Sequence, residues 1–167
     1  VQHMLASLNS KGIMASVVPH GVLFRGGEEG KIRKAMLEDD VFEAVIGFPQ
    51  NLFYGASIPA SVIILNKCKP AEKKGKILFI EASQGFVKDG NKNRLRPEDI
   101  EHIVKTYEAY QDEERFAKIA TLDEIRQNDH NLNITRYVDT SEEAEEIDIE
   151  EVISRISERE QELAESK

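Results

Sequence analysis

The stretch at residues 51–55, Asn-Leu-Phe-Tyr-Gly, has side chains suited to binding a flat ring. Phe53 and Tyr54 are adjacent aromatics in a loop bounded by glycine and proline, and Asn51 adds an amide. A nucleobase taken out of its duplex needs aromatic faces to replace its stacked neighbours, and each such stack contributes about 1–3 kcal/mol. We therefore take Phe53, Tyr54 and Asn51 as candidate base-binding residues. The alternative is that Phe53 caps the core and Tyr54 is ordinary loop surface.

A second glycine-rich segment, R-G-G-E-E-G-K at residues 25–31, contains two cations that could contact phosphate. It lacks the G-x-x-x-x-G-K-[ST] spacing of a phosphate loop, because only two residues separate its second and third glycines and isoleucine follows the lysine. We take Arg25 and Lys31 as candidate contacts to a DNA backbone. The alternative is a flexible entry into a helix, whose two glutamates complement the helix dipole.

Metal and thiol chemistry have little support in the sequence. His20 ends a predicted strand, but no carboxylate or cysteine stands at ligand spacing from it, and it receives no role. Cys68 is the only cysteine, so no internal disulfide is possible and no metal site is expected. A reducing cytoplasm is the expected location.

The elements that position these residues are short apolar runs at 14–18, 41–46 and 60–65, each bounded by polar or turn residues. A helical pattern at 29–38 lies between the first two runs. This order predicts buried strands of an α/β sheet with a crossover helix. Ligands of such sheets bind beyond the carboxyl ends of the strands, so the loops after Val18 and Ile46 are the expected site. A further run at 77–80 predicts a strand paired antiparallel with the one ending at Leu65.

The second part of the chain reads as mostly helical. Pro97 is expected at the first position of a helix, and Thr121 begins a capping box that predicts another short helix. The acidic run at 142–151 leads into a predicted tail helix with a narrow apolar stripe. The face of the helix after Pro97 consists of Ile100, Ile103, Val104, Tyr107 and Tyr110, and the tail stripe of Ile149, Val152, Ile153, Ile156 and Leu163.

Length and charge restrict the function. At 167 residues, the chain fits one domain with an appendage, and its apolar runs are too short to cross a bilayer. Residues 1–100 contain 14 Lys and Arg against 11 Asp and Glu, a net charge of +3. Residues 101–167 contain 8 against 20, a net charge of −12. A chain with this acidic balance is a poor nucleic-acid binder by itself, although its first part can still face phosphate.

Four blocks of sequence, at residues 18–33, 45–59, 91–97 and 128–138, resemble the modification subunit of type I restriction–modification systems. The blocks occur in the same order over nearly the whole chain. The resemblance implies a DNA adenine N6-methyltransferase that uses S-adenosylmethionine. It also implies two protein partners, a specificity subunit that reads the target and a restriction subunit that cleaves. Methyltransferases of this general type use an aromatic from the loop that contains Phe53 and Tyr54.

Two motifs of that family are absent here, the D-P-A-C-G-S-G type loop for the methyl donor and N-P-P-F for the adenine amino group. We expect both upstream of Val1, so that catalytic and cofactor-binding residues lie outside this chain and the chain alone is inactive. The expected fold is the second half of a Rossmann-like methyltransferase sheet with a terminal antiparallel hairpin, followed by a helical tail. Residues 1–90 would end the catalytic domain, and 91–167 would form the helical acidic region.

The rival hypothesis is a non-catalytic interaction module that docks to a partner protein through its acidic tail. The clustered glutamates would repel DNA phosphate, so the partner of the tail should be protein. The specificity subunit is the partner that the resemblance implies. The alternative is that the apolar stripe of the tail folds back on its own domain.

Overall fold

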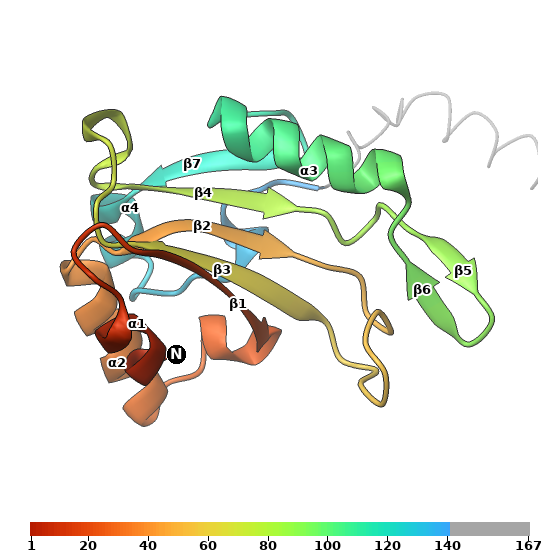
Figure 1. The fold of residues 1–167 in the computed structure, drawn as a ribbon, viewed down its shortest axis with the longest axis horizontal. Helices are drawn as coiled ribbons and strands as arrows, with labels where there is room; N and C mark the ends of the chain where they lie inside the picture. The colour runs from red at the N-terminus through yellow and green to blue at the C-terminus, as the bar shows by residue number, and fades with distance from the viewer. Residues whose placement is uncertain (141–167) are drawn as a thin grey trace, which may run out of the picture.

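The computed structural model describes residues 1–140 of the chain, so the predicted tail helix lies outside the described residues. No helix within 1–140 combines the length and the apolar character needed to cross a bilayer. The elements in chain order (Figure 1) are α1 Gln2–Ser7, β1 Ile13–Pro19, η1 His20–Leu23, α2 Gly27–Glu38, β2 Phe42–Gly47, β3 Ala60–Asn66, η2 Ala71–Lys73, β4 Lys76–Glu81, β5 Val87–Asp89, β6 Lys92–Arg94, α3 Pro97–Ala109, β7 Ala117–Thr121, α4 Leu122–Gln127 and η3 Ile134–Arg136.

A mixed five-stranded sheet in the order β1-β3-β2-β4-β7 forms the centre of the described chain. β3 runs antiparallel to both of its neighbours, so that Val62 faces Val17 on one side and Ile46 on the other. β4 pairs parallel with β2, and β7 pairs antiparallel with β4. The strands β1, β2 and β4 therefore run in one direction and end at the same edge of the sheet.

The predicted antiparallel pairing of the runs at 60–65 and 77–80 is wrong. Both edges of β3 are occupied by β1 and β2, so β4 joins the sheet on the far side of β2. The buried Lys69 fixes this connection, because its ammonium donates to the carbonyl of Phe42 at 2.9 Å and to that of Lys76 at 2.7 Å. An antiparallel hairpin does occur, but it is β5–β6, where Val87 faces Arg94.

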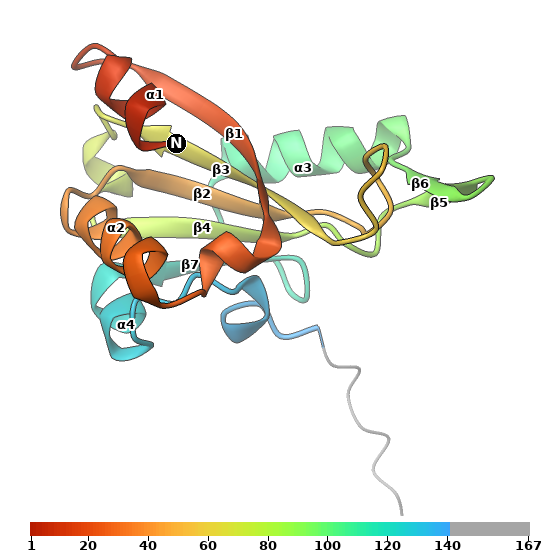
Figure 2. The same cartoon turned by 90° about the horizontal axis from the view of Figure 1, so that it is seen from below.

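Helices cover the two faces of the sheet unequally (Figure 2). On one face, α2 and α4 pack with Phe79 of β4, whose ring stacks on Tyr137 with centroids 4.1 Å apart. On the other face, α3 packs Ile103 against the strands at and around Leu78. Successive residues of β4 thus enter different cores, as the alternation of a strand requires.

The first predicted strand forms, but it is not buried as expected. In β1, only Val18 is buried, while Ile13 and Val17 are 58% and 55% exposed. β1 is exposed because it is the edge strand of the sheet. The core that α3 covers does not extend to it, and no residue of β1 belongs to that core. By contrast, β2 is buried along its whole length.

The predicted helix starts agree with the structure. α3 begins at Pro97, and Thr121 caps α4 by accepting a hydrogen bond from the N–H of Glu124 at 3.3 Å. Of the apolar face expected on α3, Ile103 is buried, whereas Ile100 and Val104 are about half exposed.

Candidate functional site

The aromatic loop, defined here as residues 48–59, leaves the sheet at the edge where β1, β2 and β4 end (Figures 1 and 2). Its neck is closed by a hydrogen bond from the N–H of Phe48 to the carbonyl of Ala60 at 3.0 Å. Pro49 is fully buried at this neck. Beyond it, Asn51 and Gly55 have left-handed backbones, with φ of 56° and 72°. Glycine adopts that conformation freely and asparagine tolerates it, which explains both residue types in the turn.

Two of the three aromatics of this loop, Phe53 and Tyr54, point away from the described core, whereas Phe48 packs against it. Phe53 is 41% exposed and Tyr54 is 92% exposed. The amide side chain of Asn51 has no hydrogen-bond partner among residues 1–140. Its backbone carbonyl, by contrast, accepts a hydrogen bond from the N–H of Asn93. The loop therefore presents two ring surfaces and one amide at the carboxyl edge of the sheet.

The hairpin β5–β6 contacts the aromatic loop directly. The N–H of Asn93 donates to the carbonyl of Asn51 at 3.0 Å, and the Asn93 side chain donates to the carbonyl of Gln50 at 2.7 Å. The ammonium of Lys92 lies 2.8 Å from the centroid of the Tyr54 ring. From the sequence, Lys92 and Asn93 received no role, although residues 91–97 form one of the four blocks of the resemblance.

His20 binds the start of β3, the strand that follows the aromatic loop. Its Nδ1 lies 3.0 Å from Oγ of the buried Ser61, and its Nε2 lies 3.1 Å from Oδ1 of Asn133. The backbone N–H of His20 also donates to the carbonyl of Pro59 at 3.2 Å. Because Asn133 Oδ1 can only accept, Nε2 carries a proton and donates to it. His20 thus has a structural role that the sequence did not suggest.

The predicted phosphate contacts, Arg25 and Lys31, are exposed, Arg25 in the link between η1 and α2 and Lys31 on α2, and neither belongs to the aromatic loop. Arg25 pairs with Glu29 at 3.8 Å, and Lys31 pairs with Glu28 at 2.7 Å. Exposed pairs of this kind contribute little to stability, so neither cation is committed to a structural task. The structure does not bring them into hydrogen-bonding or ring contact with Phe53 or Tyr54.

Arg33 is the basic residue of this segment that the fold does use. Its guanidinium donates to the carbonyls of His130, Val22 and Arg25 at 2.8, 3.0 and 2.9 Å. Burial lowers the pKa of Arg33, while the charge of Glu29 opposes this shift. Arginine nevertheless stays protonated, and here it ties α2 to η1 and to the turn before η3.

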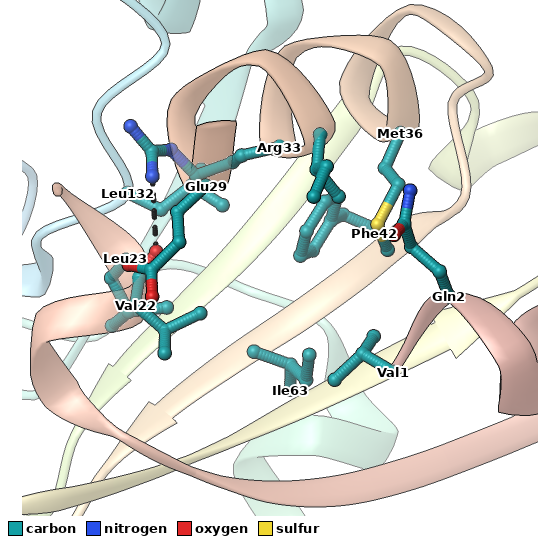
Figure 3. Close-up of a pocket in the computed structure, with 11 residues that line it drawn as sticks. Val1, Gln2, Val22, Leu23, Glu29, Arg33, Met36, Phe42, Ile63 and Leu132 are labelled. Atoms are coloured by element: carbon teal, nitrogen blue, oxygen red, sulfur yellow. Dashed lines mark hydrogen bonds between the residues drawn. The ribbon is translucent and has the colours of Figure 1, made fainter. Parts of the chain in front are cut away.

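A cavity of about 200 Å³ lies between α1, α2 and the sheet, and Figure 3 shows the residues around it. It is lined chiefly by apolar side chains such as Met36, Phe42 and Ile63. The charged Arg33 at its rim is already bonded to Val22, as the dashed line shows. None of its lining residues belongs to the aromatic loop or to the β5–β6 hairpin.

A network of charges lies at the opposite edge of the sheet, around the buried Glu43 of β2. Its carboxylate accepts from Lys73 at 2.8 Å, from Asn66 at 2.5 Å and from Tyr107 at 2.9 Å. Burial raises the pKa of Glu43, but these three hydrogen bonds outweigh it and hold the pKa below its usual value. Burial, together with the bond to Glu43, raises the pKa of Tyr107. This network joins α3 and η2 to β2 and is structural.

The described residues contain no cluster of three or more His, Cys, Asp or Glu side chains that could hold a metal ion. What the carboxyl edge offers is a projecting loop with aromatic faces, fixed at its neck by Phe48 and His20 and on its side by the hairpin. Such a surface suits the stacking of a flat ring.

Comparison with known proteins places the chain in a family. The family described as N-6 DNA Methylase matches residues 1–146. The chain is 47% identical over 161 residues to the methylase subunit of the type I restriction enzyme MjaVII from Methanocaldococcus jannaschii, covering 95% of this chain and 28% of that protein. It is 39% identical over 149 residues to the MpnII methylase subunit from Mycoplasma pneumoniae, covering 89% of this chain and 27% of that protein.

Solved structures agree with these sequence matches. The crystal structure of the type I restriction–modification methyltransferase subunit from Streptococcus thermophilus has a TM-score of 0.78 and 46% identity, over 83% of this chain and 29% of that one. The chain therefore spans between a quarter and a third of the length of these three relatives. The resemblance that the four sequence blocks predicted is confirmed.

Proposed function

Because this chain belongs to the N-6 DNA methylase family, we propose that its aromatic loop binds the target adenine during S-adenosylmethionine-dependent N6 methylation by a type I methylase subunit. The observation that carries the proposal is the exposure of the adjacent rings of Phe53 and Tyr54 on a loop with a fixed neck. An enzyme that modifies a base must extrude it, and an exposed ring can replace the lost stacking.

Methyl transfer to adenine depends on the orientation of the adenine amine more than on acid–base catalysis. The adenine amine must point at the methyl group, and the charge that develops on it must be stabilised. One ring of the aromatic loop would hold the plane of the base, and the unpartnered amide of Asn51 would hydrogen-bond to its edge. Arg25 and Lys31 are proposed contacts to the DNA backbone, since exposed carboxylates are their partners in residues 1–140.

The cavity between α1, α2 and the sheet does not suit the methyl donor. The cavity of Figure 3 is lined mostly by apolar side chains. Gln2, Glu29 and Arg33 are its polar lining residues, and Arg33 is already bonded to backbone carbonyls, so it offers few polar groups for an amino acid and a ribose. We propose that the donor site and the catalytic amide belong to a part of the subunit outside these 167 residues.

The open edge of the sheet supports a related proposal about the fold. β1 pairs only with β3 among the described strands, and Ile13 and Val17 on its surface are exposed. We propose that further strands of a Rossmann-like methyltransferase sheet continue from this edge in the complete subunit. The division of the chain at residue 90 stays a prediction, and its second part includes residues outside the described range.

Partners and location are proposed from the same premise. We expect the complete subunit to assemble with a specificity subunit and a restriction subunit on DNA in the cytoplasm. Target choice would then belong to the specificity subunit, and the aromatic loop would hold whichever adenine is presented to it. The interaction-module alternative depends on the acidic tail, which lies outside the described residues.

The test replaces each ring by alanine in the complete methylase subunit, assembled with its specificity subunit. Methyl transfer from tritiated donor to target DNA should fall by about 5- to 150-fold for the stacking residue, which corresponds to about 1–3 kcal/mol. Ile58 is the matched control, because it is an exposed apolar residue of the same loop without a ring, and Ile58→Ala should keep the wild-type rate. If both Phe53→Ala and Tyr54→Ala keep wild-type rates, the proposal is wrong.

A further inference from the structure

The ammonium of Lys92 is in an unusual environment for a lysine. Its Nζ is shielded from solvent and has no hydrogen-bond partner within residues 1–140. The group it contacts is the ring of Tyr54, whose centroid is 2.8 Å away. A cation held over the face of a tyrosine ring is attracted by the electrons of that face, which partly compensates for the lost water.

The β5–β6 hairpin holds Lys92 in this position. The next residue, Asn93, makes two hydrogen bonds to the aromatic loop, to the carbonyls of Gln50 and Asn51. These bonds set the register between the hairpin and the loop, so the side chain of Lys92 reaches the ring rather than solvent. The other cation of β6, Arg94, pairs with Asp89 on β5 at 3.4 Å and does not compete for the ring.

Tyr54 remains 92% exposed although Lys92 lies against one face of its ring. The opposite face is therefore open. We propose that Lys92 is a positioning residue for Tyr54: it occupies one ring face and holds the ring so that a base stacks on the other. This inference rests on the proposed function and names Tyr54, rather than Phe53, as the residue that stacks on the target adenine.

A cation behind the ring also has an electronic consequence. It withdraws electron density from the ring, so the open face repels the electron-rich face of a purine less. Held in this way, Tyr54 loses little conformational freedom when the base arrives, and this preorganisation favours the extruded state. Lys92 itself does not touch the base in this arrangement.

The experiment uses the complete methylase subunit with its specificity subunit and a target duplex with 2-aminopurine at the methylated adenine. Its readouts are the fluorescence of the extruded 2-aminopurine, and kcat and KM on unmodified target DNA. Lys92→Met should lower kcat/KM and the fluorescence change by about 3- to 30-fold, the range expected for a lost cation–π contact. Lys92→Arg should restore most of both signals, because arginine also stacks on a ring.

Lys88→Met is the matched control, because it removes the same charge from the same hairpin at an exposed residue without a contact to Tyr54. It should keep near wild-type values. Equal losses for Lys88→Met and Lys92→Met would show a general charge effect and overturn the positioning role. In a Tyr54→Ala background, Lys92→Met should have no further effect, and an additive loss would also overturn the proposal.

A separate measurement keeps the test independent of folding defects. In the purified subunit, with lysine labelled at the ε carbon, the Lys92 ε-methylene protons should be shifted upfield by the Tyr54 ring, and Tyr54→Ala should remove this shift. A Lys92 signal at the ordinary position would overturn the contact itself. If Tyr54→Ala lowers methylation and Lys92→Met does not, the positioning role falls while the proposed function stands. If neither Phe53→Ala nor Tyr54→Ala lowers methylation, both fall.

Discussion

Asn93 donates its backbone N–H to the carbonyl oxygen of Asn51 at 3.0 Å, and so joins the β5–β6 hairpin to the turn that precedes the two exposed rings. The Asn93 side chain adds a second bond to the neighbouring carbonyl of Gln50 at 2.7 Å. A loop held at two adjacent carbonyls by a separate hairpin has fewer conformations than one held only at its neck. The rigidity of the aromatic loop therefore depends on residues that follow it by some 40 positions.

Replacing Asn93 by alanine should loosen the loop without unfolding the protein. The substitution removes the bond to Gln50 and keeps the backbone bond to Asn51, so we expect a stability loss of about 0.5–1.5 kcal/mol. Hydrogen exchange of residues 50–57 should become faster, and methylation by the complete enzyme should fall severalfold. Asn91→Ala, at an exposed turn residue of the same hairpin, is the control and should change neither. Unchanged exchange in Asn93→Ala would contradict the role of the hairpin.

Glu43→Gln should destabilise the chain at neutral pH. An amide cannot accept at both of its ends, so the bonds from Asn66 and Lys73 cannot both survive, and an uncompensated buried charge costs about 3–5 kcal/mol. Urea unfolding at pH 7 should show a loss of this order. Glu101→Gln is the control, because that carboxylate pairs with Lys105 at the surface of α3.

The same carboxylate predicts how stability depends on pH. The folded-state pKa of Glu43 is depressed, so its contribution is complete above the unfolded-state pKa near 4.5 and is lost as the pH falls through the folded value. The stability difference between wild type and Glu43→Gln should therefore shrink in acid. A difference that stays constant from pH 7 to pH 3 would show that folding does not depress the pKa of Glu43.

The purified chain should not bind S-adenosylmethionine. The cavity of Figure 3 is lined mostly by apolar side chains and provides few polar groups for the donor, and the motif expected to bind the donor is absent from the sequence. Isothermal titration calorimetry of residues 1–167 should show no heat beyond dilution, and the chain should not methylate DNA. Micromolar binding would place at least part of the donor pocket within this chain.

Deleting residues 141–167 from the complete subunit should prevent assembly with the specificity subunit. This prediction comes from the sequence of the tail, which lies outside the described residues: a helix with such a narrow apolar stripe would be marginal alone and would need an apolar surface to bury the stripe. The rest of the subunit should keep its melting temperature. Size-exclusion chromatography that still shows the complex at wild-type affinity would exclude the tail as the docking element.

Local patterns predicted the elements of this fold better than their pairing. The start of α3 at Pro97 and the cap at Thr121 depend on a few adjacent residues, and both were predicted. The placement of the aromatic loop after a buried strand followed in the same way. The partner of β4 is different, because an apolar run does not encode which strand it pairs with. That choice depends on the two occupied edges of β3 and on Lys69, which bridges β2 and β4.

The contacts around Tyr54 were missed for a related reason. Lys92 lies in a stretch whose composition is that of a solvated turn, and only the fold brings it to the ring. His20 was likewise unassigned, because its partners, Ser61 and Asn133, are far away in the sequence. In both cases the hydrogen bonds and ring contacts join segments that local periodicity treats separately.

The exposed edge of β1 also affects how this chain behaves in a test tube. A strand with one row of free N–H and C=O groups is a template to which a strand of another chain can pair. The exposed apolar side chains of Ile13 and Val17 on β1 favour such pairing, because it would bury them. Isolated molecules should therefore associate edge to edge as concentration rises, and their light scattering should grow with it. A charged residue such as lysine at position 15, where Ala15 is exposed on the same surface, would act as a gatekeeper against this aggregation.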